Sequence, residues 1–102
     1  MEVIKMQKIM TQADVMRQLE KKYPGMTQKV QEELARLQIA YKIAELRQSC
    51  HLTQAEMARR AGLKQSNVAR MEQPGYTDYK VSTLAKLAKA AHAHLQVSFA
   101  SY

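Results

Sequence analysis

The chain has 102 residues, of which 46% are hydrophobic and 25% charged, a composition typical of one globular domain with a modest core. Its single cysteine, Cys50, excludes an internal disulfide framework, and no apolar run approaches the roughly 20 residues that a membrane-spanning helix needs. The net charge of +7 favours an anionic partner, although a basic balance alone is weak evidence for nucleic acid. We expect a cytoplasmic protein without membrane contact.

The first predicted helix covers residues 11–23. Thr11 opens it, and Asp14 three positions later makes a near capping box, in which a side-chain oxygen accepts a hydrogen bond from an unpaired backbone amide. Pro24-Gly25 ends this helix, because proline cannot continue it and glycine favours a turn. A short strand over residues 2–6, EVIKM, is a further candidate ahead of it.

A long amphipathic helix follows over residues 28–48, with Thr27 as its expected N-cap. Apolar residues recur along this helix at helical spacing. We expect them to form one face that packs on the core, made by Val30, Leu34, Leu37, Tyr41 and Ala44, with Ile43 and Leu46 nearby.

The next segment carries the signals of two short helices joined by a tight turn. Thr53 and Glu56 form a full capping box before a helix over residues 54–61, and Gly62 suits the left-handed conformation that commonly follows a helix end. Two such helices, the second starting about three residues later, make a helix–turn–helix unit. Its inward positions must be small or apolar because the helices cross closely, and all of them are: Met57, Ala58, Ala61, Leu63, Val68 and Met71.

The outward face of the second short helix is polar and compact. At 100° per residue, Gln65, Ala69, Ser66 and Arg70 span about 140° of the helix, away from Val68. A solvated helix usually carries long charged side chains in ion pairs there. Short or amide side chains with one arginine instead suit close approach to base edges, where glutamine can read adenine and arginine guanine. The pattern predicts DNA recognition in the major groove.

The C-terminal part is predicted to form a helix over residues 81–93 and then a strand over residues 94–101. In the strand the period changes from 3.6 to 2, and polar or small residues separate three apolar ones: Leu95, Val97 and Phe99. A lone strand must find a partner for its backbone groups. A second copy of the chain, the sheet of a partner protein, or residues 2–6 of the same chain would each serve.

These elements predict a mainly α fold, a five-helix bundle that contains a helix–turn–helix and ends in a short C-terminal β-strand. Three parts are expected: an N-terminal extension that is a candidate partner-binding segment, a DNA-binding domain, and a terminal strand for dimerisation or partner contact. Their ranges are residues 1–26, 27–93 and 94–102.

The stretch LRQSCHLTQAEMARRAGLKQSNVARME, residues 46–72, resembles the XRE-type (Cro/cI repressor-like) helix–turn–helix domain. The LTQ-x-x-x-A segment, the AG turn and the terminal ME carry the match, which covers residues 34–92. The whole layout is similar to that of HigA-type antitoxins of type II toxin–antitoxin systems, which have an extra N-terminal segment, a long helix before the DNA-binding unit and a short hydrophobic strand at the end. A phage-type repressor would share most of this layout.

The resemblance implies three sets of site residues. The base-reading positions, with one residue bordering them, match Gln65, Ser66, Arg70 and Ala69. The positions near the DNA backbone match Gln54, Lys64 and Asn67. Arg59 and Arg60 are expected to face phosphate or solvent rather than bases. Arg47 and Glu72 match a pair that forms a salt bridge between the preceding helix and the recognition helix, so that losing one partner would leave a charge poorly compensated.

Two positions depart from the family's pattern. Lys64 stands where serine or threonine usually caps the recognition helix, so its cap is weaker or is replaced by a phosphate contact. The loop before the last helix has Tyr79-Lys80 in place of a Pro-Ser pair. These two residues are expected either at the DNA backbone or in an ordinary exposed loop.

Nothing in the sequence indicates catalysis, a cofactor or a metal. His92 and His94, with Cys50-His51, lack the spacing of two ligand pairs, and a structural zinc site needs four ligands. No glycine-rich phosphate loop or nucleophile elbow occurs. We expect a protein that is not an enzyme.

The favoured hypothesis is a homodimeric repressor that reads an inverted repeat in double-stranded DNA, with one recognition helix per half-site. Its expected setting is bacterial: an antitoxin, nucleoid-associated when bound to DNA, that neutralises a RelE/HigB-like ribonuclease toxin and represses its own operon. The toxin contact is expected in residues 1–30 and the C-terminal strand. The alternatives are a stand-alone or phage-type repressor, and a protein-interaction adaptor of the same fold without specific DNA binding.

Overall fold

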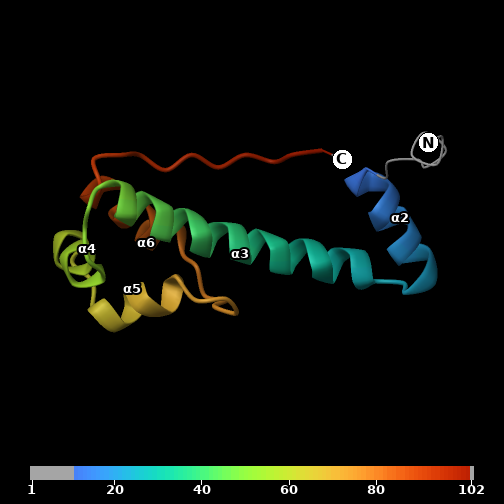
Figure 1. Ribbon diagram of the computed structural model, residues 1–102, viewed down its shortest axis with the longest axis horizontal. Coiled ribbons are helices and arrows are strands. Elements are labelled where there is room, and N and C mark those ends of the chain that lie inside the picture. Colours follow the sequence, from blue (N-terminus) through green and yellow to red (C-terminus); the bar gives the residue numbers. More distant parts are fainter. Residues whose placement is uncertain (1–10, 102) are drawn as a thin grey trace, which may run out of the picture. The chain divides into compact units, whose positions relative to one another are not determined.

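The computed structural model describes residues 11–101, which form five helices (Figure 1). They are α2 (Gln12–Lys22), α3 (Met26–Ser49), α4 (Gln54–Ala61), α5 (Gln65–Met71) and α6 (Val81–Ala90). The prediction of a mainly helical fold is therefore confirmed. The chain divides into two compact units: the first holds α2 and the start of α3, and the second is residues 33–98, with the rest of α3 and the other helices. Among the described helices, none has the length and apolar character needed to cross a membrane.

In the first unit, α2 begins at a complete capping box. The Thr11 hydroxyl accepts a hydrogen bond from the Asp14 amide, and the Asp14 carboxylate accepts one from the Thr11 amide, each at 3.1 Å. The hydrogen bond from the Thr11 backbone also lowers the pKa of the Asp14 carboxyl. After α2 the chain turns at Gly25, whose φ of 87° is left-handed and whose amide donates to a Glu20 carboxylate oxygen at 2.9 Å. The expected end of this helix at Pro24-Gly25 is confirmed.

The start of α3 differs from the prediction. The helix already begins at Met26, so Thr27 lies inside its first turn and does not cap it. Instead, the Thr27 hydroxyl donates to the Met16 carbonyl on α2 at 3.0 Å, and Met16 is the buried residue of this helix. The Thr27 hydroxyl thus bonds to the neighbouring helix rather than to its own, and this contact cannot be predicted from the residues around Thr27.

The predicted buried face of α3 was also wrong for its central residues. Leu34, Leu37 and Tyr41 are exposed at 41%, 45% and 63%. The prediction is confirmed for Ile43, which is buried in the core, and for Leu46, which packs against that core. The helix also buries Ala40, and Ile39 packs against the core, neither of which was predicted. Because α3 carries apolar residues on two sides, helical spacing alone does not say which side is buried. The packing of α4 to α6 against the C-terminal part of α3 decided it (Figure 1).

The core of the second unit is built around the helix–turn–helix. Its most deeply buried side chains are Met57 on α4, Val68 and Met71 on α5, and Leu87 on α6, each at most 2% exposed. Fully burying a side chain of this size contributes about 1.5–3 kcal/mol. Ala58 is buried with them, and the two remaining inward positions, Ala61 and Leu63, pack half-buried against the cluster. The inward pattern read from the sequence is confirmed.

The turn between α4 and α5 depends on one glycine. Gly62 has φ 71°, the left-handed conformation that most L-residues avoid, and the next amide, that of Leu63, donates to the Ala58 carbonyl at 2.8 Å. At the other end of α4, the Thr53–Glu56 capping box is complete. The hydrogen bond from the Thr53 backbone lowers the pKa of the Glu56 carboxyl. Both predictions for this helix are confirmed.

Two other helices end with a histidine in the position that glycine usually takes. His51 after α3 and His92 after α6 have φ 56° and 58°. In each case the following amide closes the helix end: Leu52 donates to the Arg47 carbonyl at 3.1 Å, and Ala93 to the Ala88 carbonyl at 2.8 Å. The last helix is therefore shorter than the predicted 81–93.

The predicted C-terminal strand is not formed among the described residues. Residues 94–101 run without strand pairing, and Val97 and Phe99 are 70% and 99% exposed. A strand needs a neighbour for its backbone groups, and no strand is present in residues 11–101 to supply them. The other candidate strand, EVIKM at residues 2–6, lies outside the described residues.

Candidate nucleic-acid interface

Helix α5 presents one polar face and anchors the opposite one. Val68 and Met71 are buried in the core, whereas Gln65, Ser66 and Arg70 are exposed. Asn67 and Ala69 are half-buried at the sides of the exposed face. The anchored side chains hold the helix against α4, so the exposed ones have a defined position relative to the rest of the unit.

Arg70 is oriented by a neighbour one turn earlier. Its Nη2 donates to the Asn67 side-chain oxygen at 3.0 Å. A guanidinium carries five N–H groups, so most of its donors remain available. Asn67, expected near phosphate, has its carbonyl oxygen engaged with this arginine, and its amide group keeps two donors of its own.

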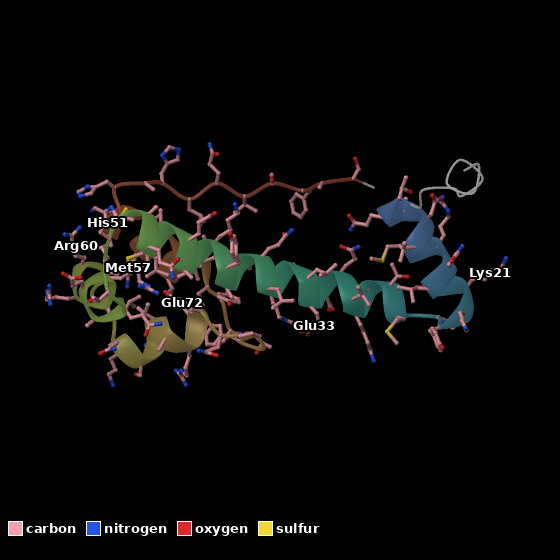
Figure 2. All side chains as sticks on the ribbon, viewed as in Figure 1. Lys21, Glu33, His51, Met57, Arg60 and Glu72 are labelled. Atoms are coloured by element: carbon pink, nitrogen blue, oxygen red, sulfur yellow. The ribbon has the colours of Figure 1, made fainter. Side chains whose placement is uncertain are left out.

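A largely buried ion pair ties α3 to the end of α5. Arg47 Nε lies 2.7 Å from Glu72 Oε2, Arg47 Nη2 donates to Glu72 Oε1 at 3.0 Å, and the two side chains are only 14% and 7% exposed. Arg47 Nη1 also donates to the Leu52 carbonyl at 2.9 Å, which secures the segment that leads into α4 (Figure 2 shows Glu72). The two residues expected to form a salt bridge are thus side by side.

Hydrogen bonding within this pair lowers the pKa of Glu72 and raises the pKa of Arg47. Burial by itself raises the pKa of the Glu72 carboxyl, but the hydrogen bonds from Arg47 and Gln54 outweigh it and hold this pKa below its ordinary value. The hydrogen bond to Glu72 raises the pKa of Arg47 above its ordinary value. The pair therefore stays ionised at neutral pH.

Gln54 joins the same network, which the sequence did not reveal. Its Nε2 donates to Glu72 Oε1 at 3.1 Å, and the residue is half-buried at the first position of α4. An amide group has two hydrogens, so one remains for a phosphate oxygen. Because 18 positions separate the two residues, only the packing of α4 beside α5 brings them together.

The loop before α6 uses its tyrosines for packing. The Tyr79 hydroxyl donates to the Met71 carbonyl at 2.7 Å, and its ring meets that of Tyr76 edge to face, with centroids 4.8 Å apart. Burial, and then the neighbouring Tyr76, raise the pKa of Tyr79. A phenol has one hydrogen to donate, and Tyr79 gives it to the end of α5. The predicted contact of Tyr79 with DNA phosphate has no support in this geometry.

The other cationic candidates project into solvent. Lys64, Arg59 and Lys80 are exposed, at the N-cap of α5, on α4 and at the N-cap of α6. Lys64 makes no side-chain capping hydrogen bond, and a phosphate contact in its place stays a prediction. In the described part of the chain, no three potential metal ligands lie together.

The fold and this surface define a helix–turn–helix domain with an anchored, polar recognition helix. The family model for Helix-turn-helix (HTH_3) matches residues 43–96, more than half of the chain, and the chain belongs to this XRE-type family. Membership indicates a DNA-binding regulator. Neither curated proteins nor solved structures gave a significant match to the chain.

Proposed function

We propose that this protein is a sequence-specific transcriptional repressor that binds double-stranded DNA with α5 in the major groove. The observation that carries the proposal is the exposed set Gln65, Ser66 and Arg70 on a helix fixed from behind by Val68 and Met71. Arg70 pairs with guanine and Gln65 with adenine, while Ala69 contacts a thymine methyl and Ser66 either kind of base. Each good bidentate contact discriminates against the wrong base by about 1–3 kcal/mol.

Contacts with the DNA backbone supply most of the affinity. The proposed contacts are the free Gln54 amide hydrogen, the Asn67 amide and three exposed cations: Arg59, Lys64 and Lys80. The network around Glu72 sets the angle between α4 and α5, and thereby places Gln54 on the backbone while α5 enters the groove. Because each cation that neutralises a phosphate releases counterions, binding weakens steeply as salt is raised.

The repressor acts as a homodimer on an inverted repeat, so that two copies of α5 meet successive half-sites. The extended C-terminal segment is the proposed pairing element, for a second copy or for a partner's sheet. Its backbone is unpaired within residues 11–101, and two of its alternating apolar residues, Val97 and Phe99, are largely exposed, while Leu95 is half-buried. Pairing would satisfy the backbone groups and cover these side chains.

The proposed biological setting is a HigA-type antitoxin in the bacterial cytoplasm that neutralises a RelE/HigB-like ribonuclease and represses the operon encoding both. The family match begins at residue 43, so α2 and the first part of α3 lie outside the DNA-binding unit and form a candidate toxin contact. Co-expression with the product of an adjacent gene tests this setting. A co-purifying complex in which the partner's ribonuclease activity is blocked supports it, and a chain that purifies alone favours a stand-alone repressor.

The DNA-binding proposal is tested by fluorescence anisotropy with a duplex from upstream of the protein's own gene and a scrambled duplex, at two salt concentrations. Gln65→Ala and Arg70→Ala should each lose the preference for the native duplex. Arg17→Ala, which removes one charge from an exposed arginine on α2, is the matched control and should keep it. Equal binding of both duplexes, unchanged by the α5 substitutions, would replace this proposal with an interaction adaptor of the same fold.

A further inference from the structure

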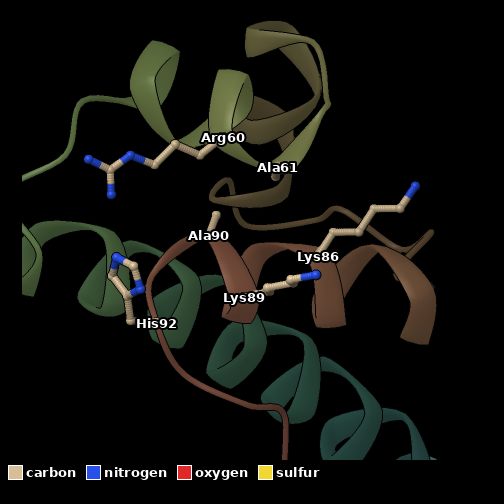
Figure 3. Close-up of a pocket in the computed structure, with 6 residues that line it drawn as sticks. All are labelled: Arg60, Ala61, Lys86, Lys89, Ala90 and His92. Atoms are coloured by element: carbon tan, nitrogen blue, oxygen red, sulfur yellow. The ribbon is translucent and has the colours of Figure 1, made fainter.

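An open hollow of about 590 Å³ lies between the C-terminal ends of α4 and α6 (Figure 3). Arg60 extends from α4 on one side, and Lys86 and Lys89 extend from α6 on the other. The imidazole of His92 stands at the end of α6, and two alanines complete the lining, Ala61 and Ala90. We define these six residues as the basic hollow. Its polar side chains are all cationic or imidazole groups.

No ion pair within the described residues neutralises the basic side chains of the hollow. No acidic residue follows Asp78 in the chain. Among residues 11–101, no ion pair within 4.0 Å engages Arg60, Lys86 or Lys89. Glu56, one turn before Arg60 on α4, accepts a hydrogen bond from the Thr53 amide at the opposite end of that helix. This hydrogen bond, and to a smaller extent the charge of Arg60, lower the pKa of the Glu56 carboxyl.

Favourable interaction with helix C-termini explains a single cation at the end of α4 or α6. It does not explain the gathering of basic side chains from two helices around one hollow. Lys86 in particular lies four residues before the end of α6, where the effect of the helix end has largely faded.

The basic hollow lies away from Gln54 and Lys80, two of the proposed DNA-facing residues on the same helices. The third, Arg59, directly precedes Arg60 but points about 100° away from it around α4, and it does not line the hollow. Gln54 is the first residue of α4 and Lys80 precedes the first residue of α6, whereas Arg60 and Lys89 are close to the other ends. At 1.5 Å per residue, the separation along the helix axes is about 9 Å on α4 and about 13 Å on α6. A ligand in the hollow and a duplex against α5 therefore use different ends of α6 and different sides of α4.

The lining also selects among anions. A compact phosphate is usually held by backbone amides at a helix N-terminus, whereas this hollow is bordered by the C-terminal parts of two helices. Single-stranded nucleic acid is usually stacked on aromatic side chains, and none lines it. Long basic side chains around a floor of two alanines fit carboxylates carried on a polypeptide, with an arginine able to hold one in a bidentate pair.

We propose that the basic hollow is a docking site for an acidic segment of a partner protein, bound while α5 remains free for DNA. This inference does not depend on the antitoxin setting. The test uses the full-length protein and a fluorescein-labelled peptide of alternating glutamate and alanine, with an alternating glutamine and alanine peptide for comparison, in fluorescence anisotropy. The glutamate peptide should bind, more weakly as salt rises, and the glutamine peptide should not.

The decisive variant is Lys86→Gln/Lys89→Gln, and Lys21→Gln/Lys29→Gln is its control because it removes the same charge from exposed lysines outside the hollow. The first should weaken peptide binding about tenfold, as expected for two lost charge contacts, and the control less than about twofold. Circular dichroism checks that both variants are folded. Both should bind duplex DNA as the unchanged protein does.

Three results would overturn the proposal. Absence of glutamate-peptide binding at low salt removes the site altogether. Equal weakening in the two lysine variants means that the peptide senses only net charge. Loss of duplex binding in Lys86→Gln/Lys89→Gln, with binding retained in the control, reassigns the basic hollow to the DNA backbone.

Discussion

Replacing Glu72 by glutamine tests the part of the structure on which the DNA-binding geometry depends. The carboxylate accepts two hydrogen bonds from Arg47, at 2.7 and 3.0 Å, and one from Gln54, at 3.1 Å. A carboxylate offers two accepting oxygens, whereas an amide offers one oxygen and presents an NH₂ donor in place of the other. In Glu72→Gln, Arg47 therefore keeps its buried charge, loses the opposing charge and faces a donor on one side.

The expected loss in the free energy of unfolding depends on how deeply the ion pair is buried. Removing one partner of a fully buried ion pair costs about 3–5 kcal/mol. Arg47 and Glu72 are 14% and 7% exposed, and the glutamine keeps one accepting oxygen, so the cost falls below that range. A hydrogen bond to a charged group contributes about 1.5–3 kcal/mol, and we expect Glu72→Gln to lower the free energy of unfolding by about 2–3 kcal/mol. For a domain of this size, that lowers Tm by roughly 10–20 °C.

Urea unfolding followed by circular dichroism at pH 7 measures this loss. Glu45→Gln is the matched control, because Glu45 pairs with Lys42 at 3.3 Å with side chains 49% and 72% exposed, and such a pair contributes less than about 1 kcal/mol. A Glu72→Gln protein as stable as the Glu45→Gln control would refute the view that this network holds the helix–turn–helix together.

The pH dependence supplies a second check on the same residue. Because the pKa of Glu72 is lower in the folded protein than its ordinary value of 4.5, the unfolded chain takes up the proton more readily. The stabilisation is therefore complete above the ordinary pKa and is lost as pH falls through the lowered one. The stability difference between the unchanged protein and Glu72→Gln should be full at pH 7 and should shrink as pH falls below 4.5.

Three further substitutions have defined outcomes. Gly62→Ala should lower the free energy of unfolding by about 1 kcal/mol, because φ at this residue is 71°. Nothing lies within 4 Å of an added Cβ, so only the backbone conformation is strained. An unchanged midpoint of urea unfolding would contradict this expectation. Met57→Ala should cost about 2–5 kcal/mol by leaving a cavity at a side chain with no exposure, whereas Val97→Ala, at a site 70% exposed, should stay within about 0.5 kcal/mol in the same measurement. Tyr79→Phe should lower the free energy of unfolding by about 1 kcal/mol, because the hydrogen bond to the Met71 carbonyl is lost. It should leave the salt dependence of DNA binding unchanged. A shallower salt dependence would indicate that the Tyr79 hydroxyl contacts a phosphate.

Features of the candidate site could be predicted from the sequence where the residues concerned lie close together in the chain, and not where they lie far apart. The exposed positions of α5 could be predicted because Gln65, Ser66 and Arg70 share one helix with Val68 and Met71, and helical spacing alone separates the two faces. Helical spacing does not predict the hydrogen bond from Gln54 to Glu72 or that from Tyr79 to the Met71 carbonyl, because each joins residues in different elements. The prediction for Tyr79 therefore offered only the DNA backbone or an ordinary exposed loop and missed its hydrogen bond to the Met71 carbonyl. The basic hollow, which lies between α4 and α6, was not anticipated.

The amino-acid sequence by itself determined the features whose chemistry is complete within a few residues. The capping boxes at Thr11 and Thr53, the left-handed turn at Gly62 and the apolar positions of the helix–turn–helix each depend on neighbours within about one or two helical turns. Only the tertiary structure decided which side of α3 is buried, because both sides carry apolar residues and the choice follows from where α4 to α6 pack. The same holds for residues 94–101, since an alternating pattern becomes a strand only when another chain segment pairs with its backbone.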